Sequence, residues 1–351
     1  MVSRRTLAFL LAGLATAIGA LSVAVEIGTA QSLGPRISFQ ILTGSGSGTY
    51  FPVGQLIAGL ISHPPGVDRC ESAAVCGPQG LIISARTSDG AVANVMAVNA
   101  GRAESGLAQG DVVSQAFAGK GAFRRTGRLS NLRVIANLFP EEVHLVVARN
   151  AKIARIEDLK GKRVSLGAES SGTSVTARTI LNAYGLGEWR MKVLHNTSDV
   201  DAQLLQQGRL DAFFFVGGTP VALVDDLIAR GVARLVPIDG KGRDRLVKAN
   251  PALSVDAIPA GTYRGTPVVQ TVSVRAFWVV NNRVSDAVVY GIVRALFNPG
   301  NRAALDQGAP ASRQIRLTNA ITSLPAPLHP GALRYYREVG RPLPPNGGPK
   351  I

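Results

Sequence analysis

The stretch ILTGSGSGTYFPVG, residues 41–54, decides the fold class of this chain. The segment that leads into it, RISFQILT (36–43), is predicted to be a strand, and YFPVGQLIAGLIS (50–62) is predicted to be a helix. The three glycines between them let the backbone approach a ligand closely. The N-terminus of the helix adds unpaired N–H groups and a partial positive charge, which suits an anion. The stretch therefore indicates an α/β protein, with either a purely structural turn or an anion or carboxylate site at this strand end.

Nucleotide-binding and nucleophile motifs do not match this turn. A P-loop requires Gly-Lys-Ser/Thr, and the turn contains no lysine; the third glycine of the dinucleotide fingerprint comes one residue early. Neither Ser45 nor Ser47 has glycines two residues before and after it, so the turn is not a nucleophile elbow.

Similar strand-to-helix turns recur along the chain. They follow strands predicted to end at residues 87, 166 and 216, and they contain SDGAVANV (88–95), ESSGTSV (169–175) and GGTP (217–220). Strands that alternate with helices predict parallel-rich sheets flanked by helices, in which ligands bind beyond the carboxyl ends of the strands. Two such turns are what two lobes need to hold one small anion between helix N-termini.

Three further segments are predicted to form strands. LRVIANLF (132–139) and EVHLVVAR (142–149) are predicted to be two separate strands, and ESGLAQGDVV (104–113) a strand that enters a turn. No repeat of fixed period and no long Pro/Ser linker occurs, so two domains would be joined by strands rather than by a tether.

The N-terminal 30 residues are predicted to be a cleavable signal peptide. Arg4 and Arg5 precede an apolar run of about 20 residues, and Gly28 and Ala30 occupy the −3 and −1 positions of a cleavage site. An uncleaved anchor and a twin-arginine signal are the alternatives, and each of them also places the rest of the chain outside the cytoplasm. We therefore expect a periplasmic protein.

The amino-acid composition narrows the class of protein and the kind of partner that we expect. The 351 residues suggest about two domains, and 46% hydrophobic with 17% charged residues indicates an ordinary globular chain. The formal charge of +15 comes from scattered basic residues without interleaved aromatics, so no nucleic-acid partner is expected. Cys70 and Cys76 are predicted to form a small loop-closing disulfide in an oxidising compartment.

No catalytic or metal-binding constellation emerges. The four histidines are far apart in the sequence and lack metal-ligand spacing, and the adjacent acidic pairs at 141–142 and 225–226 have no partner carboxylate that the sequence places opposite them. We expect no enzyme activity, no metal and no cofactor.

At this point the residues resemble a known family, the TAXI-type solute-binding proteins, which are the extracytoplasmic receptors of one class of TRAP transporter. The resemblance runs from about residue 37 to residue 340. The motifs that carry it, in chain order, are TGSGSGTYFPVG, TSDGAVANVMAVNAGRAESGLAQGD, IEDLKGKRVSLGAESSGT, GRLDAFFFVGGTP, IPAGTYRG, TVSVRAFWVVNNRVSDAVVYGIVRALF and LPAPLHPGALRYYREVG.

The resemblance implies a two-lobed periplasmic-binding fold of type II-like form, with the ligand cleft between the lobes. Residues 31–147 and 272–351 would form one lobe and 148–271 the other. It implies a receptor that closes around a small organic anion, such as glutamate or another carboxylate, and delivers it to a TRAP-type membrane permease. We expect the protein to be a monomer. By motif position, the residues that line the cleft would be Gly48, Thr49, Tyr50, Asn94 and Asp111 from the first lobe, and Ser171, Gly172, Thr173 and Gly218 from the second.

The sequence departs from the family in two places. Gly90–Ala91 stands where the family has Gly-Ser, which removes one hydroxyl group and counts against glutamate as the ligand. The segment SHPPGVDRCESAAVCGPQG (62–80) is longer than usual and could form a rim of the cleft. A sensor that docks on a signalling receptor and an exported enzyme that uses the same cleft remain the alternative functions.

Overall fold

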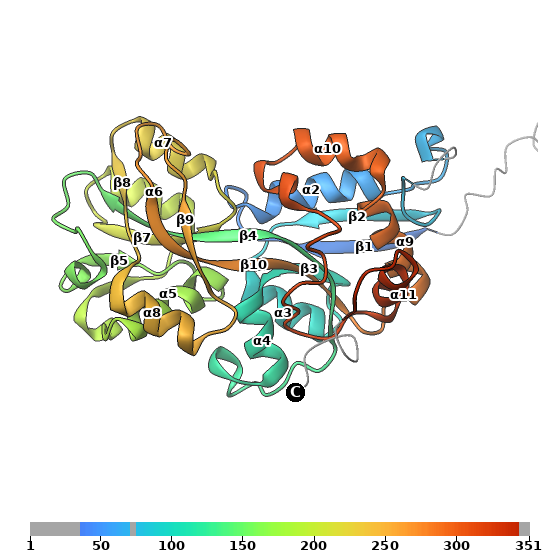
Figure 1. Ribbon diagram of the computed structural model, residues 1–351, viewed down its shortest axis with the longest axis horizontal. Helices are drawn as coiled ribbons and strands as arrows, with labels where there is room; N and C mark the ends of the chain where they lie inside the picture. Colours follow the sequence, from blue (N-terminus) through green and yellow to red (C-terminus); the bar gives the residue numbers. More distant parts are fainter. Residues whose placement is uncertain (1–35, 71–74, 344–351) are drawn as a thin grey trace, which may run out of the picture. The chain divides into compact units, whose positions relative to one another are not determined.

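A computed structural model describes residues 36–70 and 75–343 of the chain. The predicted signal peptide lies outside these residues. From Ile37 onward the chain forms one compact unit, drawn in Figure 1. None of the helices within the described ranges has the length and apolar character that a membrane crossing requires.

The unit is an α/β structure with one continuous sheet (Figure 1). Its strands are β1 (Ile37–Leu42), β2 (Leu81–Arg86), β3 (Ser105–Gln109), β4 (Leu132–Ala148), β5 (Arg163–Ser165), β6 (Lys192–Leu194), β7 (Ala212–Gly217), β8 (Ala233–Val236), β9 (Ser254–Ile258) and β10 (Val269–Asn281). The longer helices are α2 (Tyr50–Ile61), α3 (Ala91–Asn99), α4 (Gly110–Ala118), α5 (Gly172–Ala183), α6 (Ser198–Gln206), α7 (Ala222–Ala229), α8 (Gly240–Ala249), α9 (Asp286–Leu296), α10 (Arg302–Gln307) and α11 (Pro330–Glu338).

The sheet has parallel pairs near both ends and antiparallel pairs in the middle. Its order is β2-β1-β3-β10-β4-β7-β5-β6, with β8 beside β4 and β9 beside β10. β1 pairs in parallel with β2 and β3, and β5 pairs in parallel with β6 and β7. The long strands β4 and β10 are antiparallel to their neighbours. The predicted α/β class, with parallel strands and flanking helices, is confirmed.

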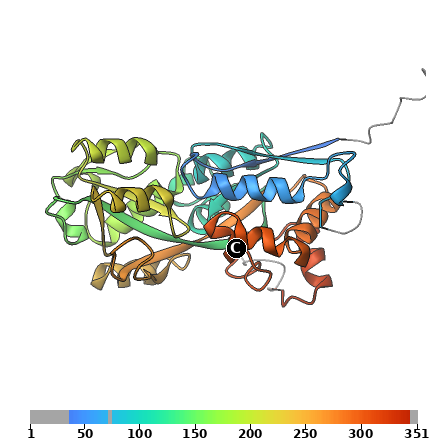
Figure 2. The same ribbon diagram turned by 90° about the horizontal axis from the view of Figure 1, so that it is seen from above.

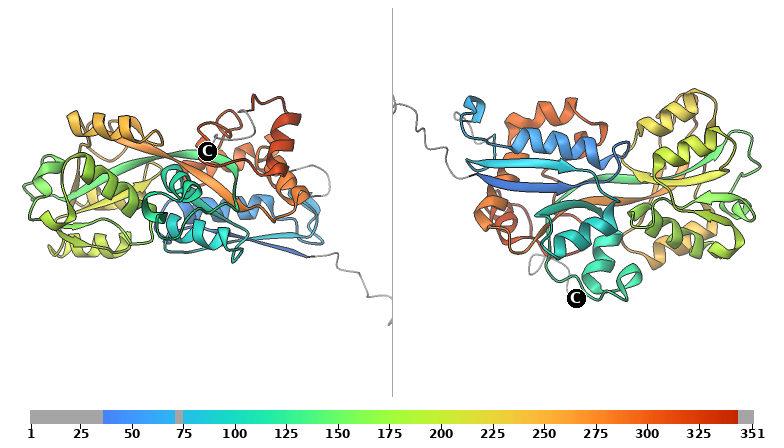
Figure 3. Two further views of the ribbon diagram at one scale, coloured as in Figure 1. Left: turned by 90° about the horizontal axis from the view of Figure 1, so that it is seen from below. Right: turned by 180° about the vertical axis from the view of Figure 1, so that it is seen from behind.

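Helices cover both faces of the sheet, as Figures 2 and 3 show from above, below and behind. In the part that contains β1–β3, α3 and α4 lie on one face and α2 on the other. Helix α9 packs against α2, and α11 packs against α9. In the part that contains β5–β7, α5 and α8 cover one face and α6 and α7 the other. Buried strands flanked by helices on both faces are expected to be apolar throughout, and AFFFVG of β7 is buried along its whole length.

Two predictions about local structure were wrong. The two strands expected at 132–139 and 142–149 are one strand, β4, because the chain continues through Pro140. Pro140 lies opposite Arg275 in the ladder with β10, and the pairing with β7 starts only at Glu142. A proline near the point where a strand changes neighbours interrupts few ladder hydrogen bonds. The turn expected after β3 is instead helix α4, which begins at Gly110.

The buried apolar side chains form separate groups. One group comes from residues 39–139 and 276–336 together with Val175. Two further groups come entirely from residues 143–274. These limits lie close to the predicted lobe boundaries, which themselves stay a prediction.

The disulfide predicted between Cys70 and Cys76 is confirmed. Both cysteines are buried, and the pair closes a short loop between α2 and β2.

Candidate functional site

A cavity of about 100 Å³ lies where the turns after the parallel strands meet. The residues that line it come from the ends of β1, β2, β3, β5 and β7, from β4, and from the segment that leads into α6. They are Gly44, Ser45, Gly48, Thr49, Tyr50, Ser88, Asp89, Gly90, Ala91, Gln109, Glu141, Gly167, Ala168, Ser171, Gly172, Thr173, Asn196, Thr197, Ser198, Asp201, Phe214, Phe215 and Val216.

The glycine-rich turn after β1 forms one wall of the cavity. Thr49 is the N-cap residue of α2, and its side chain makes no capping hydrogen bond. The first N–H groups of a helix have no partner within the helix, so the start of α2 presents donors beside the cavity. The hydroxyl of Tyr50 donates a hydrogen bond of 2.7 Å to Oε2 of Glu141.

The turn after β5 forms the facing wall. Gly167 has a φ of +85°, a conformation that favours glycine. The hydroxyl of Ser171 accepts a hydrogen bond from the N–H of Ser174 and so caps α5. The N–H groups of Gly172 and Thr173, in the first turn of α5, belong to the set that a helix leaves without internal partners. Two helix N-termini therefore border the same cavity.

The start of α3 is occupied by the protein itself. The N–H groups of Val92 and Ala93 donate to the carbonyl oxygen of Ser170 at 3.1 and 3.3 Å. This contact joins the turn after β2 to the turn after β5. The N-terminus of α3 therefore has a main-chain acceptor in place of a ligand.

Further contacts join the two predicted lobes around the cavity. The hydroxyls of Ser47 and Ser198 lie 3.1 Å apart. On another side, the hydroxyl of Thr176 donates a hydrogen bond of 2.8 Å to Oδ2 of Asp111. Both residues of this second pair are buried.

Three carboxyl groups lie at the cavity, those of Asp89, Glu141 and Asp201. Burial raises the pKa of Glu141 well above its usual range, although the hydrogen bond from Tyr50 lowers it. Burial also raises the pKa of Asp201 to about 7, against the lowering effect of the Asn196 amide. Asp89 adds an exposed carboxyl group. Among the described residues that line the cavity, none is Lys, Arg or His.

One more lining residue has an unused polar group. Gln109 is 3% exposed, and its Oε1 has no hydrogen-bond partner. A buried amide oxygen without a partner is costly unless a bound molecule or water donates to it. The cavity thus offers donors at the two helix starts and an unpaired polar atom at Gln109.

Six of the nine candidate residues named from the sequence border the cavity: Gly48, Thr49, Tyr50, Ser171, Gly172 and Thr173. The other three lie nearby but outside the lining. Asn94 donates to the carbonyl oxygens of Thr43 and Leu107 at 2.6 and 2.8 Å. Asp111 is bonded to Thr176 as described, and Gly218 packs so closely that an added Cβ would lie 2.7 Å from Cβ of Ala311.

Several lining residues escaped the sequence analysis as candidates, chiefly Glu141, Asn196, Ser198 and Asp201. For Asp201 a signal existed. It lies four residues before Leu205 in α6, and both are buried, so a carboxyl group occupies the apolar face of this helix. For Glu141 the signal was its place in the long apolar stretch of β4. Within the part of the chain that the structure describes, no group of three or more His, Cys, Asp or Glu could hold a metal ion.

Comparison with solved structures finds distant similarity. The chain is similar to the alkanesulfonate-binding protein SsuA from Xanthomonas axonopodis pv. citri bound to MOPS, at 17% identity over 88% of this chain and 86% of that one, with a TM-score of 0.43. It is also similar to MatC from Rhodopseudomonas palustris with bound malate, at 13% identity over 77% and 87% of the two chains, with a TM-score of 0.49. Neither similarity is close enough to indicate a ligand for this chain.

Comparison with family models gives the assignment. Residues 41–340 match the model described as the NMT1-like family. This match spans both predicted lobes and every turn that borders the cavity. The chain therefore belongs to the NMT1-like family, a family of periplasmic proteins that bind small solutes.

Proposed function

We propose that this protein is an extracytoplasmic receptor of the TAXI type, which binds a small organic anion by hinge closure and delivers it to a TRAP-type membrane permease. The observation that carries the proposal is the pair of helix N-termini, those of α2 and α5, that border one cavity from two sides. Such termini bind carboxylates through main-chain N–H groups and the helix dipole.

Closure is supported by the contacts that already join the two predicted lobes. They connect Ser47 to Ser198, Asp111 to Thr176, and the N-terminus of α3 to Ser170. A ligand that bonds to both helix starts would stabilise this arrangement over an open one, because it binds the closed form better.

The carboxyl groups at the cavity narrow the class of ligand that we propose. A simple dicarboxylate such as succinate would bring two negative charges into a cavity that contains the carboxyl groups of Asp89, Glu141 and Asp201. No cationic side chain among the described lining residues would compensate these charges. Glutamate carries an ammonium group in addition to its two carboxylates, so its net charge is −1 rather than the −2 of succinate. Its carboxylates could bond to the helix starts and its ammonium group to these carboxyls. We therefore propose an organic anion that also carries an ammonium or other donor group, in preference to succinate-like compounds.

A thermal-shift screen tests the binding proposal. The panel contains glutamate, glutamine, 2-oxoglutarate, succinate, other C4–C6 dicarboxylates, small keto acids and sulfonates. A ligand at 100 times its dissociation constant adds about 2.7 kcal/mol of stability, which raises the unfolding midpoint by several degrees. Succinate that binds as tightly as glutamate would contradict the charge argument. Product formation at catalytic rates would contradict a pure binding function.

Site-directed variants test the location. Thr49→Ala removes a hydroxyl group from the cavity wall and is expected to weaken binding several-fold, whereas the fold should be unaffected because this hydroxyl makes no capping bond. Isothermal titration with the ligand from the screen measures the change. Delivery is tested separately, by uptake of that ligand in cells that lack this gene or an adjacent TRAP-type permease gene. Uptake that survives both deletions would contradict the transport proposal.

A further inference from the structure

A second cavity of about 330 Å³ lies beside α10, far along the chain from the first. It is bordered by the C-terminal end of α9, by η5 (Pro299–Asn301), by α10 and by residues 315–317. We call it the α10 cavity. It shares no lining residue with the cavity described above.

The walls of the α10 cavity are mainly apolar. Leu296, Leu305 and Ile315 are almost completely buried, while Phe297 and Leu317 are half-buried. All five border the cavity. An apolar wall of this kind favours a hydrocarbon group over water.

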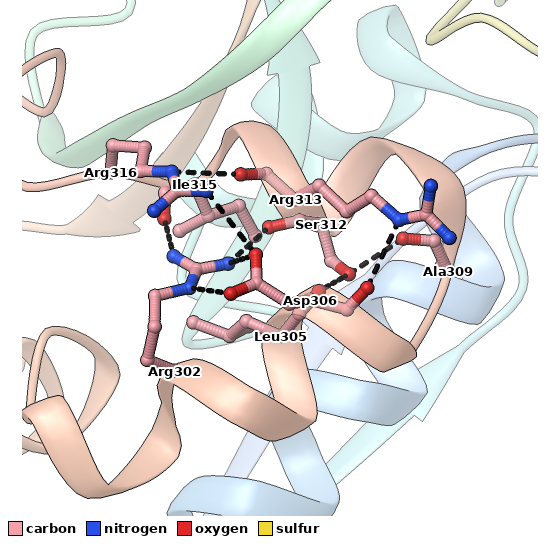
Figure 4. A network of polar contacts seen from close by, with 8 residues as sticks. All are labelled: Arg302, Leu305, Asp306, Ala309, Ser312, Arg313, Ile315 and Arg316. Atoms are coloured by element: carbon pink, nitrogen blue, oxygen red, sulfur yellow. Dashed lines mark hydrogen bonds and ion pairs between the residues drawn. The ribbon is translucent and has the colours of Figure 1, made fainter.

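One edge of the α10 cavity is positively charged and rigidly built. Arg302 borders it and donates to both carboxylate oxygens of Asp306, at 2.9 and 2.8 Å, and to the carbonyl oxygen of Ile315 at 2.6 Å. The side chain of Arg302 holds the pKa of Asp306 below its usual range. Figure 4 shows this network from close by.

Arg316 supplies a second guanidinium group at the same edge. Its Nε donates to the carbonyl oxygen of Arg313 at 3.1 Å, and its Nη2 to Oδ1 of Asp306 at 3.3 Å. Its Nη1 has no hydrogen-bond partner among the described residues, and the side chain is 49% exposed. Two guanidinium groups thus share one carboxylate, which leaves one positive charge uncompensated beside an apolar cavity.

The side chain of Arg313 points in a different direction from those of Arg302 and Arg316 (Figure 4). Its Nε donates to the main-chain oxygen of Asp306 at 3.0 Å. In Figure 4 its guanidinium group points away from those of Arg302 and Arg316, on the other side of Asp306. Arg313 does not border the α10 cavity. It therefore belongs to the same local structure but adds no charge to the edge of the cavity.

We propose that the α10 cavity is a second binding site, which takes an amphipathic monoanion. The carboxylate, sulfonate or phosphodiester group would bond to the free edge of Arg316, because guanidinium forms strong charge-assisted hydrogen bonds with such groups. A short apolar body would lie against the leucine side chains. A volume near 300 Å³ is in the range of sites for small organic ligands, which combine apolar walls with a few placed polar groups.

Titration calorimetry with octane-1-sulfonate and octanoate, below the concentrations at which they form micelles, tests this proposal on the purified chain. Octan-1-ol has the apolar body without the charge, and acetate has the charge without the body. Both are expected to bind at least tenfold more weakly than the amphiphiles. Equal binding of octan-1-ol, or no saturable binding of either amphiphile to the folded protein, would overturn the proposal.

Two matched variants locate the site. Arg316→Gln is expected to weaken octane-1-sulfonate binding at least tenfold, and Arg313→Gln, which removes the same charge on the other side of Asp306, less than twofold. Equal effects of the two variants would show general surface attraction and overturn the assignment. Leu317→Trp fills the cavity without a change of charge and should also abolish binding, so the proposal stays testable if Arg316→Gln does not fold.

The same headgroup chemistry could come from a free amphiphile or from an anionic lipid. Co-sedimentation with phosphatidylglycerol vesicles, with phosphatidylcholine vesicles as the control, separates the two sources. Sedimentation that Arg316→Gln abolishes and Arg313→Gln does not would assign a lipid headgroup. Absence of sedimentation together with calorimetric binding would assign a free amphiphile.

Discussion

Replacement of Thr176 by valine removes a single hydrogen bond between the two predicted lobes without a change in the cavity. The hydroxyl of Thr176 donates to Oδ2 of Asp111 at 2.8 Å, and the other carboxylate oxygen accepts the N–H of Val112. Neither Thr176 nor Asp111 borders the cavity. Valine has nearly the same shape as threonine, so the main change is the loss of one donor to a buried carboxylate.

The size of the effect follows from the burial of Asp111. A buried acceptor that loses its partner costs about 1–3 kcal/mol. This cost falls on the closed form, because water can solvate the carboxylate once the lobes separate. Since about 1.4 kcal/mol corresponds to a factor of ten, ligand affinity is expected to fall roughly five- to 150-fold when the open form predominates before binding.

Thr179→Val is the matched control. Thr179 lies in the same helix, and its hydroxyl donates to the carbonyl oxygen of Val175 within that helix. The substitution makes the same chemical change without touching the contact between the lobes, so affinity should stay within about twofold of the parent. Titration calorimetry measures both dissociation constants, and small-angle scattering of the ligand-free variants measures the open fraction.

The pH dependence of ligand affinity gives a second test of the contact between Thr176 and Asp111. The hydrogen bond from Thr176 lowers the pKa of Asp111, which burial raises. Without it the carboxyl group takes up a proton more readily, and a neutral carboxyl group is less costly to bury. The loss caused by Thr176→Val should therefore shrink as the pH falls. Parent-like affinity of this variant, or an equal loss in Thr179→Val, would refute the proposed role of this contact in closure.

Three further outcomes are expected. Asp201→Asn should raise the free energy of unfolding by up to about 4 kcal/mol above pH 7 and leave it unchanged below pH 4, as urea unfolding at both pH values can measure. The reason is that a carboxyl group with a pKa of about 7 in the folded state makes the parent less stable as the pH rises from about 4 to 7. Gly172→Ala should weaken ligand binding at least tenfold, measured by calorimetry, with little change in the midpoint of thermal unfolding. The new Cβ would lie 1.2 Å from Oε1 of Gln109 and would displace that side chain within the cavity. The double variant Cys70→Ser with Cys76→Ser should lower the free energy of unfolding by about 2 kcal/mol, the loss expected when a disulfide that closes a short loop is removed. Ligand affinity should stay unchanged, because neither cysteine borders the cavity.

Much of the fold was predictable because local patterns and tertiary structure agree. The strand before the glycine-rich turn and the helix after it occur as β1 and α2, and the Ser171 cap marks the start of α5. The prediction failed where a local signal was weaker than long-range pairing. Two separate strands were expected at 132–139 and 142–149, yet pairing with β10 on one side and with β7 farther along keeps β4 continuous.

The lining of the cavity was predictable only in part, because sequence shows where polar groups gather but not which of them bond to one another. Asn94 and Asp111 stand at strand-to-helix turns, as Thr49 and Gly172 do, and no local feature separates the two pairs. In the folded chain, the amide of Asn94 donates to main-chain oxygens, and the carboxylate of Asp111 accepts from Thr176. Their hydrogen-bonding capacity is used within the protein, whereas helix starts keep N–H groups that no internal partner can satisfy. In a fold of this type, the donors left over by the helices therefore indicate a ligand better than the polar side chains beside them.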